Sequence, residues 1–349
     1  MSNKKKLFTK LIPLFFMFVT PVAAQYRMPI YTDYLTDNYF LLHPAMAGAH
    51  YEGMKVRTSF RTQWLEIANA PSMQTLNVHA RVGDKSGIGG MVFNDKNGFH
   101  SNTGIQATYA HHINFYRSQN EINQLSFGLS AGGSFHRHDQ TAFPPSSEAV
   151  IKGEQVNSSS IYMDVGIMYN LVSFYTHLTI QNLVFQGKNV GDQVLLESPM
   201  RFLVSAGNFF EITSKWALEP SLLADYLQYV DRPNIDISLK SHHSIRQTQL
   251  WLGTSYRKGV TNTLDNTSTA SYNEPFTQLT LLTGVKHQNW TFSYAYTVGL
   301  GNIKINNTGF HQFTLGIDFL SDKYRPTFIR GILENLYFIS LATNIIFIS

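Results

Sequence analysis

Hydrophobic and polar residues alternate along most of this chain with a period of two. Clear runs of alternating apolar positions are Leu125, Phe127 and Leu129; Ile161, Met163, Val165, Ile167 and Tyr169; and Trp290, Phe292, Tyr294, Tyr296 and Val298. Successive side chains of a β-strand point to opposite faces, so this pattern predicts strands with one apolar face. After the N-terminal segment no apolar run reaches the roughly 18 residues of a membrane helix, and we expect no transmembrane helices.

The alternation divides the chain into fourteen candidate strands. They span 54–64, 73–81, 86–94, 103–113, 122–135, 160–170, 172–180, 201–210, 215–229, 234–240, 247–256, 277–286, 289–298 and 310–319. Most have about 9 to 11 residues, the length that a tilted strand needs to cross a bilayer. An even number suits a bacterial single-chain barrel. The predicted fold is all-β, a transmembrane outer-membrane antiparallel β-barrel of about 14 strands with short periplasmic turns and long extracellular loops.

The lengths of the connections point the same way. Long polar connections follow odd-numbered strands, at 136–159, 181–200, 257–276 and 299–309, whereas short ones follow even-numbered strands, near 170–171, 211–214 and 287–288. This parity predicts a periplasmic N-terminus. Two connections depart from it, the short 230–233 and the longer 114–121.

A secreted β-sandwich or lectin-like barrel is the soluble alternative, because it also alternates. Such a soluble fold would show neither the alternation of long and short connections nor so many strands of one length. Aromatic residues near the strand ends suit a membrane girdle, although aromatics favour any strand. These residues are Tyr109, Phe115, Tyr116, Trp216, Tyr226, Tyr229, Trp251, Tyr256, Trp290 and Tyr324.

The N-terminal 24 residues predict a secretory signal peptide. Four lysines precede the apolar stretch 11–19, and Val22, Ala23 and Ala24 supply the small residues of a cleavage site. The whole chain carries 27 basic and 23 acidic residues, a net charge of +4. All four excess charges lie in this segment, so the mature chain is neutral. A nucleic-acid-binding protein would keep a basic surface, so we expect no nucleic-acid partner here.

Composition and motifs indicate no catalytic chemistry. The chain has no cysteine, and only 14% of its residues are charged, against roughly 25% in a typical soluble domain. Thirteen histidines include His136 and His138 on one strand face, and the adjacent pairs 111–112 and 242–243, but no metal motif frames them. No GxSxG surrounds a serine. The glycine-rich stretch 87–90 lacks phosphate-loop spacing and indicates small residues in a curved strand. We therefore predict no enzyme activity, no cofactor and no metal site.

The segment between the signal peptide and the first strand, residues 25–53, is rich in Tyr, Asp and Asn. Pro44 biases His43 toward an extended conformation, and Gly48 permits a turn before the strand begins. Two interpretations stay open. The segment enters the barrel as a plug or packs on its periplasmic mouth, or it is a plain lead-in strap.

Several ordered motifs carry a family resemblance. Pro29, Tyr34 and Asn38 precede the box Pro44-Ala45-x-Ala47-Gly48, which is followed by Arg61-x-Gln63-Trp64 and Pro71. Weaker matches are Gly87-Ile88-Gly89, Asn97-Gly98, the strand 292–296 and Phe310-His311. From about 25 to 319 the chain resembles the PorP/SprF-like proteins of Bacteroidetes. It departs from them at His43, where the family usually has Asn, and at His311-Gln312, where it usually has His-Glu.

The resemblance implies a non-catalytic outer-membrane barrel of the type IX secretion and gliding-motility system. Such a protein binds the C-terminal sorting domain of a secreted adhesin-like protein and supports its export or anchors it at the cell surface. The implied partners are that surface protein, other type IX secretion components and membrane lipid. The long loops around 139–158, 181–200 and 257–276 are candidate contacts. The alternative function is an outer-membrane channel or porin for small solutes.

The predicted organisation is thus a signal peptide at 1–24, a lead-in or plug at 25–53, a barrel at 54–319 and a tail at 320–349. In the tail, 322–330 is polar and 332–349 is largely apolar. The pattern assigns it no role.

Overall fold

A computed structural model describes residues 38–49, 53–63, 70–115, 123–141, 153–189, 199–228, 233–262, 273–300 and 309–319. The predicted signal peptide, most of the predicted lead-in, Trp64 and the tail 320–349 lie outside the described residues.

The described residues form fifteen strands and two short 3-10 helices. The helices are η3 (Tyr39–Leu41) and η4 (Pro44–Met46), and the strands are β1 (Met54–Gln63), β2 (Ser72–Arg81), β3 (Ser86–Asn97), β4 (His100–Asn114), β5 (Asn123–Asp139), β6 (Gln155–Leu171), β7 (Phe174–Asn189), β8 (Arg201–Asn208), β9 (Phe210–Thr213), β10 (Trp216–Leu227), β11 (Asn234–Ile245), β12 (Thr248–Asn262), β13 (Asn273–His287), β14 (Trp290–Gly299) and β15 (Phe310–Phe319).

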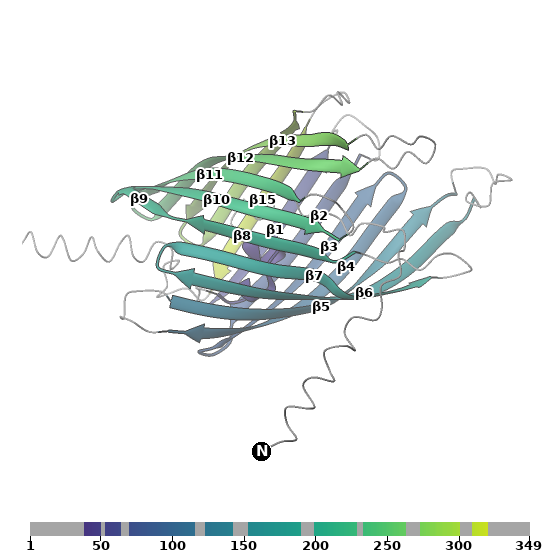
Figure 1. The fold of residues 1–349 in the computed structure, drawn as a ribbon, viewed down its shortest axis with the longest axis horizontal. Coiled ribbons are helices and arrows are strands. Elements are labelled where there is room, and N and C mark those ends of the chain that lie inside the picture. The colour runs from purple at the N-terminus through teal and green to yellow at the C-terminus, as the bar shows by residue number, and fades with distance from the viewer. Residues whose placement is uncertain are drawn as a thin grey trace, which may run out of the picture.

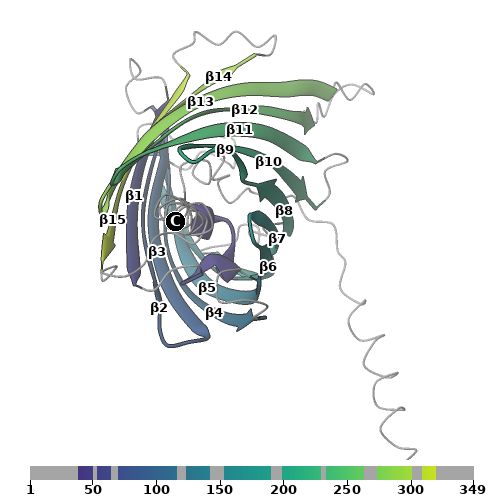
Figure 2. The ribbon, with the colours of Figure 1, turned by 90° about the vertical axis from the view of Figure 1, so that its left-hand side faces the viewer.

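The strands form one closed antiparallel barrel (Figure 2). Each strand pairs with its neighbours in the chain, and β1 closes the ring against β15, with Met54 opposite Phe319 and Gln63 opposite Phe310. The short β9 and the preceding β8 both pair with β10, so together they occupy one position in the wall. The barrel therefore has fourteen strands around its wall, which confirms the predicted fold.

Several predicted boundaries are wrong, mostly at the ends joined by long connections. β5 runs to Asp139 and β6 starts at Gln155, so both enter the predicted loop 136–159. β7 runs to Asn189, well into the predicted loop 181–200. Mostly polar residues occupy the extensions of β5 and β6 on both faces, and in β7 a register shift opposite β6 is followed by three apolar residues in a row, 183–185, so the alternation is hidden in each. The ladder nevertheless continues, because its hydrogen bonds come from the backbone and need no apolar side chain.

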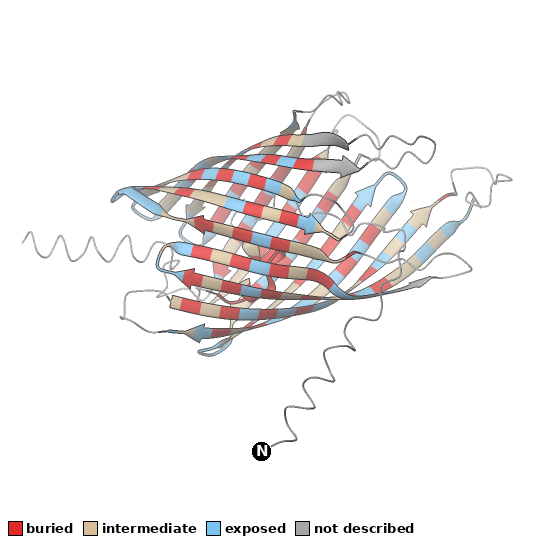
Figure 3. Ribbon diagram, in the orientation of Figure 1, coloured by how far each residue is buried: buried red, intermediate tan, exposed pale blue. Residues whose placement is uncertain are grey.

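Buried and exposed residues alternate along the strands of the wall (Figure 3), and the two sets differ in polarity. Side chains buried on the inner face are mostly polar and include Asn77, Ser126, Ser130, Asp164, Thr179, Ser205, Glu219, Asp236, Ser255, Thr280, Gln312 and Thr314. Large apolar side chains are exposed on the outer face, among them Leu76, Ile105, Leu129, Ile161, Val204, Ile237, Leu252, Leu281 and Phe313. A soluble sandwich or barrel would bury the apolar set, whereas a membrane barrel exposes it to lipid.

One predicted girdle residue points the wrong way. Trp216, Tyr226, Tyr256 and Trp290 are exposed, as the girdle hypothesis expects, but Trp251 is buried. Its ring packs over Gly284 of the neighbouring strand, where a Cβ would overlap the indole. Trp251 therefore fills space inside the barrel.

The connections differ in length between the two ends of the barrel. At one end they are 82–85, 115–122, 172–173, 214–215, 246–247 and 288–289. At the other end they are 64–71, 98–99, 140–154, 190–200, 228–233, 263–272 and 300–309. We call these the short-turn end and the long-connection end. The predicted parity holds, with 98–99 and 115–122 as the exceptions.

Among the described residues, no helix is long and apolar enough to cross a membrane. The two 3-10 helices lie inside the ring of strands instead (Figure 2).

Candidate functional site

A short segment fills part of the barrel lumen. Residues 38–49, which we call the plug, contain η3 and η4 and contact β4, β5 and β6. Pro44 starts η4, where its missing N–H costs no helical hydrogen bond. Gly48 has φ = +65°, a left-handed conformation that glycine adopts without strain. The family box Pro44–Gly48 is thus a compact turn inside the lumen.

Glycines on the inner wall make room for this turn. A Cβ at Gly128 of β5 would overlap the backbone of Pro44 and Ala45, and one at Gly87 of β3 would overlap the carbonyl of Ala47. At Gly166 of β6 a Cβ would lie 3.1 Å from Cδ of Pro44. The wall and plug backbones therefore approach as closely as only glycine allows. The sequence pattern attributes Gly87 to strand curvature, but its place against Ala47 is a more specific reason.

His43 connects the plug to β7 and β8. Its Nδ1 lies 2.9 Å from Oγ1 of Thr179, and its Nε2 lies 3.1 Å from Oγ of Ser205. The imidazole also stacks on that of His177, with ring centroids 4.5 Å apart. Burial, with a smaller contribution from His177, lowers the pKa of His43 well below its usual value. The ring is therefore neutral and has hydrogen-bond partners for both nitrogens.

The end of the box is held by three basic side chains. Nε2 of His112 donates to the Ala47 carbonyl at 2.9 Å. The backbone N–H of Gly48 donates to Nδ1 of His79 at 3.0 Å, and Nη1 of Arg81 donates to the Gly48 carbonyl at 3.0 Å. These bonds satisfy backbone groups that a tight turn leaves without partners. They also fix the direction in which the chain leaves for β1.

A buried charge cluster holds the beginning of the plug. The Tyr39 hydroxyl donates to Oε1 of Glu219 at 3.2 Å and lies 2.9 Å from the Tyr175 hydroxyl. Glu219 also pairs with Lys240 and with Nε2 of His242, each at 2.8 Å. A carboxylate with this many donors is stabilised despite its burial. Through Tyr39, η3 is tied to β7 and β10.

Three of the remaining family residues lie at the opposite end of the barrel. Arg61 and Gln63 are near the end of β1, and Pro71 directly precedes β2, all toward the long-connection end. The Arg61 guanidinium lies 4.8 Å from the centre of the Phe310 ring, and Arg61 is opposite Gln312 in the β1–β15 ladder. Trp64 lies outside the described residues. The structure therefore does not bring the predicted residues together into one site.

Ion pairs line the inner wall on several strands. Asp318 of β15 bonds Arg57 of β1 at 2.8 Å and Lys286 of β13 at 2.5 Å, across the seam where the barrel closes. Arg201 pairs with Asp225, and Arg257 with Asp236. Each pair joins neighbouring parts of the wall, and pairing is what makes charge tolerable in a lumen.

The histidines do not assemble a metal centre in the part of the chain that the structure describes, where no group of three or more candidate ligands occurs. His138 lies across from His100, with their Nδ1 atoms 3.0 Å apart, and His136 contacts Ser134. In each adjacent pair one histidine has a structural contact. His112 donates to the Ala47 carbonyl of the plug, and His242 bonds the Glu219 carboxylate.

Most partners of the plug carry no local sequence signal. Thr179, Ser205, Tyr175 and Glu219 are ordinary polar residues on inward-facing strand positions. Strand periodicity places them on the inner face, but their approach to residues 136 to 180 positions earlier depends on barrel closure. Sequence reasoning therefore missed them.

The family described as type IX secretion system membrane protein PorP/SprF matches residues 23–317. The chain belongs to the PorP/SprF family. The match covers the plug and nearly the whole barrel, and confirms the resemblance seen in the box and in Arg61-x-Gln63-Trp64. PorP/SprF membership supports a part in type IX secretion, and together with the closed barrel and its apolar outer face it supports an outer-membrane location.

Solved structures resemble this PorP/SprF barrel at low identity. The CymD monoaromatic hydrocarbon channel is 14% identical over 80% of this chain and 91% of its own, with a TM-score of 0.47. The toluene transporter TodX of Pseudomonas putida is 10% identical over 84% and 94%, with a TM-score of 0.41. BamA from Haemophilus ducreyi lacking POTRA domains 1–3 is 10% identical over 77% and 71%, with a TM-score of 0.42. No curated protein matches the chain.

Proposed function

We propose that this protein is a non-catalytic outer-membrane barrel that binds the C-terminal domain of a secreted adhesin-like protein and so supports its export or anchors it at the cell surface. The observation that carries the proposal is the PorP/SprF match over residues 23–317. The long-connection end would face outward and the N-terminus would lie in the periplasm. The connection lengths at the two ends support this orientation.

A tall section of wall offers a surface for the cargo. β5 and β6 have 17 residues each and β7 has 16, whereas β1 and β2 have 10. In Figure 1 the ribbons of β5, β6 and β7 run along the lower side of the barrel. Crossing a bilayer needs about 9 to 11 residues, so roughly 20 Å of these strands extend beyond the hydrocarbon layer. We assign cargo contact to the inner face of this extension, where His136 and His138 lie.

The seated plug argues for an anchor rather than a porin. His43, Ala45 and Ala47 have no exposed surface, and the plug is bonded to β2, β4, β7, β8 and β10. A solute path through the short-turn end would require these contacts to break. The proposed function needs no such path.

Replacing 136–158 by a two-residue Asn-Gly turn tests the cargo surface. The two ends of this deletion are adjacent in the ladder, where Phe135 is opposite Ser159, so the barrel below it is preserved. We expect native purification of the full-length protein to recover one large secreted protein, and the trimmed variant to lose it. The matched control replaces 116–121 at the short-turn end in the same way, and should keep the partner.

Two results would overturn the proposal. One is cargo recovery that is unchanged by trimming the tall wall. The other is a large, steady solute-permeable current through the purified wild-type protein in planar bilayers, which would favour the porin.

A further inference from the structure

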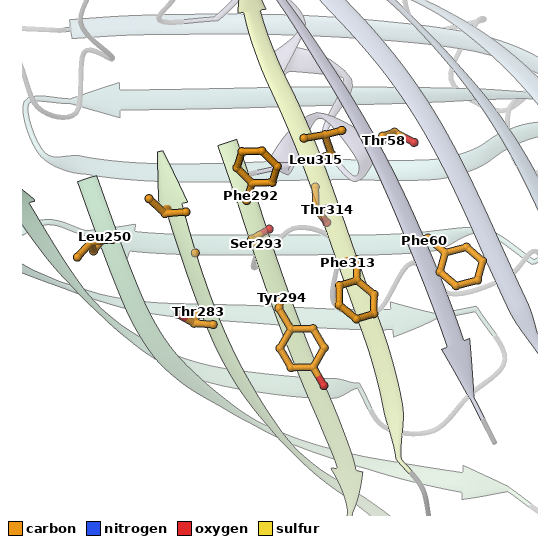
Figure 4. A pocket seen from close by; sticks show the side chains of 12 residues that line it. Thr58, Phe60, Leu250, Thr283, Phe292, Ser293, Tyr294, Phe313, Thr314 and Leu315 are labelled. Atoms are coloured by element: carbon orange, nitrogen blue, oxygen red, sulfur yellow. The ribbon is translucent and has the colours of Figure 1, made fainter. Parts of the chain in front are cut away.

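The outer wall carries an apolar groove over the seam of the barrel. It has a volume of about 540 Å³ and is lined by outward side chains of β1, β12, β13, β14 and β15. Figure 4 shows the rings of Phe292 and Tyr294 on β14 beside Phe313 on β15, with Phe60 on β1 at the edge. Sites for small ligands typically measure roughly 300–1,000 Å³. The groove is thus large enough to hold a ligand, and it is too large to be a packing defect.

Three polar residues of the lining, Thr58, Thr283 and Tyr294, use their hydroxyls in hydrogen bonds within the barrel, that of Tyr294 with Nδ1 of His311 at 2.8 Å. The Thr58 hydroxyl donates to the Thr75 carbonyl at 3.1 Å, and the Thr283 hydroxyl donates to the Trp251 carbonyl at 3.3 Å. Both threonines are therefore left with methyl groups facing the groove. A ligand that needs hydrogen bonds finds little here, and a hydrocarbon chain finds only apolar contacts.

The backbone around the groove leaves no edge for a peptide strand. β13 pairs with β12 and β14, β15 pairs with β14 and β1, and β1 pairs with β2. A segment added as a strand requires unpaired backbone groups, and inside a membrane it has no water to satisfy its own. An acyl chain has no such groups.

On β12, β13 and β14 the groove lies nearer the short-turn end, while on β1 and β15 it extends past mid-strand to Phe60 and Phe313, each the fourth residue from the long-connection end. Phe292 is the third residue of β14 from the short-turn end, and Leu315 and Thr283 are the fifth residues of β15 and β13 from it. In the orientation proposed above, the part of the groove on β12, β13 and β14 lies in the periplasmic half of the membrane, whose leaflet is phospholipid. We propose that the groove binds one acyl chain of a phospholipid from the periplasmic leaflet and retains that lipid on the barrel seam. The inference rests on the proposed orientation, but not on cargo binding.

A matched pair of variants tests this site. Thr283→Trp fills the groove, and Thr176→Trp changes a threonine on the other side of the barrel whose hydroxyl also donates to a neighbouring carbonyl, that of Ser205 at 3.0 Å. The full-length proteins are extracted from outer membranes in a mild detergent and examined by native mass spectrometry. We expect one phospholipid on the wild type and on Thr176→Trp. Thr283→Trp should bind it roughly tenfold less, the effect of losing about two buried methylenes.

A second measurement identifies the position of the chain. The wild type is reconstituted with a phosphatidylethanolamine that carries a photoreactive diazirine on one acyl chain, and adducts are mapped by peptide mass spectrometry. We expect them to concentrate on Phe292, Phe313 and Leu315. An even spread over outward residues such as Ile105 and Ile161 would show an ordinary lipid shell and overturn the proposal. Retention of lipid A instead of phospholipid would overturn the leaflet assignment, and equal lipid on both variants would overturn the site. Cargo recovery, scored on the same samples, is expected to stay unchanged in Thr283→Trp, so failure of either proposal is distinguishable.

Discussion

His112 on β4 donates a 2.9 Å hydrogen bond from Nε2 to the carbonyl of Ala47, and so ties the wall of the barrel to the plug. Its Nδ1 lies 2.8 Å from the Ser126 hydroxyl, which therefore donates to it. The ring is thus held in one tautomer by two partners. This arrangement makes the plug a seated part of the structure, and its contacts can be broken one at a time.

Replacing His112 by leucine should weaken the seating of the plug. The Ala47 carbonyl would be left buried without this donor, at a cost of about 1–3 kcal/mol. We expect a lower midpoint of thermal unfolding, read from the mobility shift of the barrel in SDS gels. His111→Leu is the control, because His111 is on the opposite face of the strand. Equal shifts in both variants would mean that the plug contact contributes nothing.

Gly128→Val should displace the plug more strongly. The new side chain would overlap the backbone of Pro44 and Ala45, at a cost of about 1–3 kcal/mol or more. The chain has no cysteine, so a single Ala45→Cys substitution reports accessibility cleanly. We expect the introduced thiol to resist maleimide until Gly128→Val is added. Gly133→Val on the same strand is the control, because its Cβ meets its nearest atom only at 3.5 Å. Labelling of the Ala45→Cys thiol should stay slow when Gly133→Val is added.

Glu219→Gln should be among the most destabilising single changes. It would leave Lys240 buried without its carboxylate and weaken the contacts to Tyr39 and Tyr175. Loss of one partner of a buried ion pair costs about 3–5 kcal/mol. Denaturant unfolding should show this loss. Glu211→Gln, at an exposed position of β9, should stay within about 0.5 kcal/mol of the wild type.

Acid should loosen the plug through His43. Its pKa is lowered in the seated plug by burial and by His177, whereas a released His43 would titrate near 6.5. The released form therefore binds the extra proton, and seating weakens as the pH falls below about 6.5. Maleimide labelling of the Ala45→Cys variant, normalised to that of an exposed Lys85→Cys variant, should rise between pH 7.5 and pH 5. Adding His43→Asn, the usual family residue, should make this rise smaller. An identical pH response with and without His43→Asn would exclude His43 as the titrating group.

The barrel itself was predictable because strand alternation is local. A period of two along Ile161 to Tyr169 reports one apolar face wherever the partners lie, and connection lengths report which strand ends meet. Local patterns failed where polar residues cover both faces, as in the outer parts of β5 and β6. They also could not orient Trp251, since an aromatic near a strand end suits either face.

Sequence by itself determined the class of fold, the number of strands around the wall and the family of this protein. Only the tertiary structure decided that the box Pro44–Gly48 lies in the lumen while Arg61 and Gln63 lie at the opposite end. It also decided that Gly87 and Gly128 are glycines because the plug backbone touches them. The physical reason is distance along the chain. Contacts such as His43 with Ser205 join residues 162 positions apart, and they exist only after β1 has closed on β15 and set every register between them.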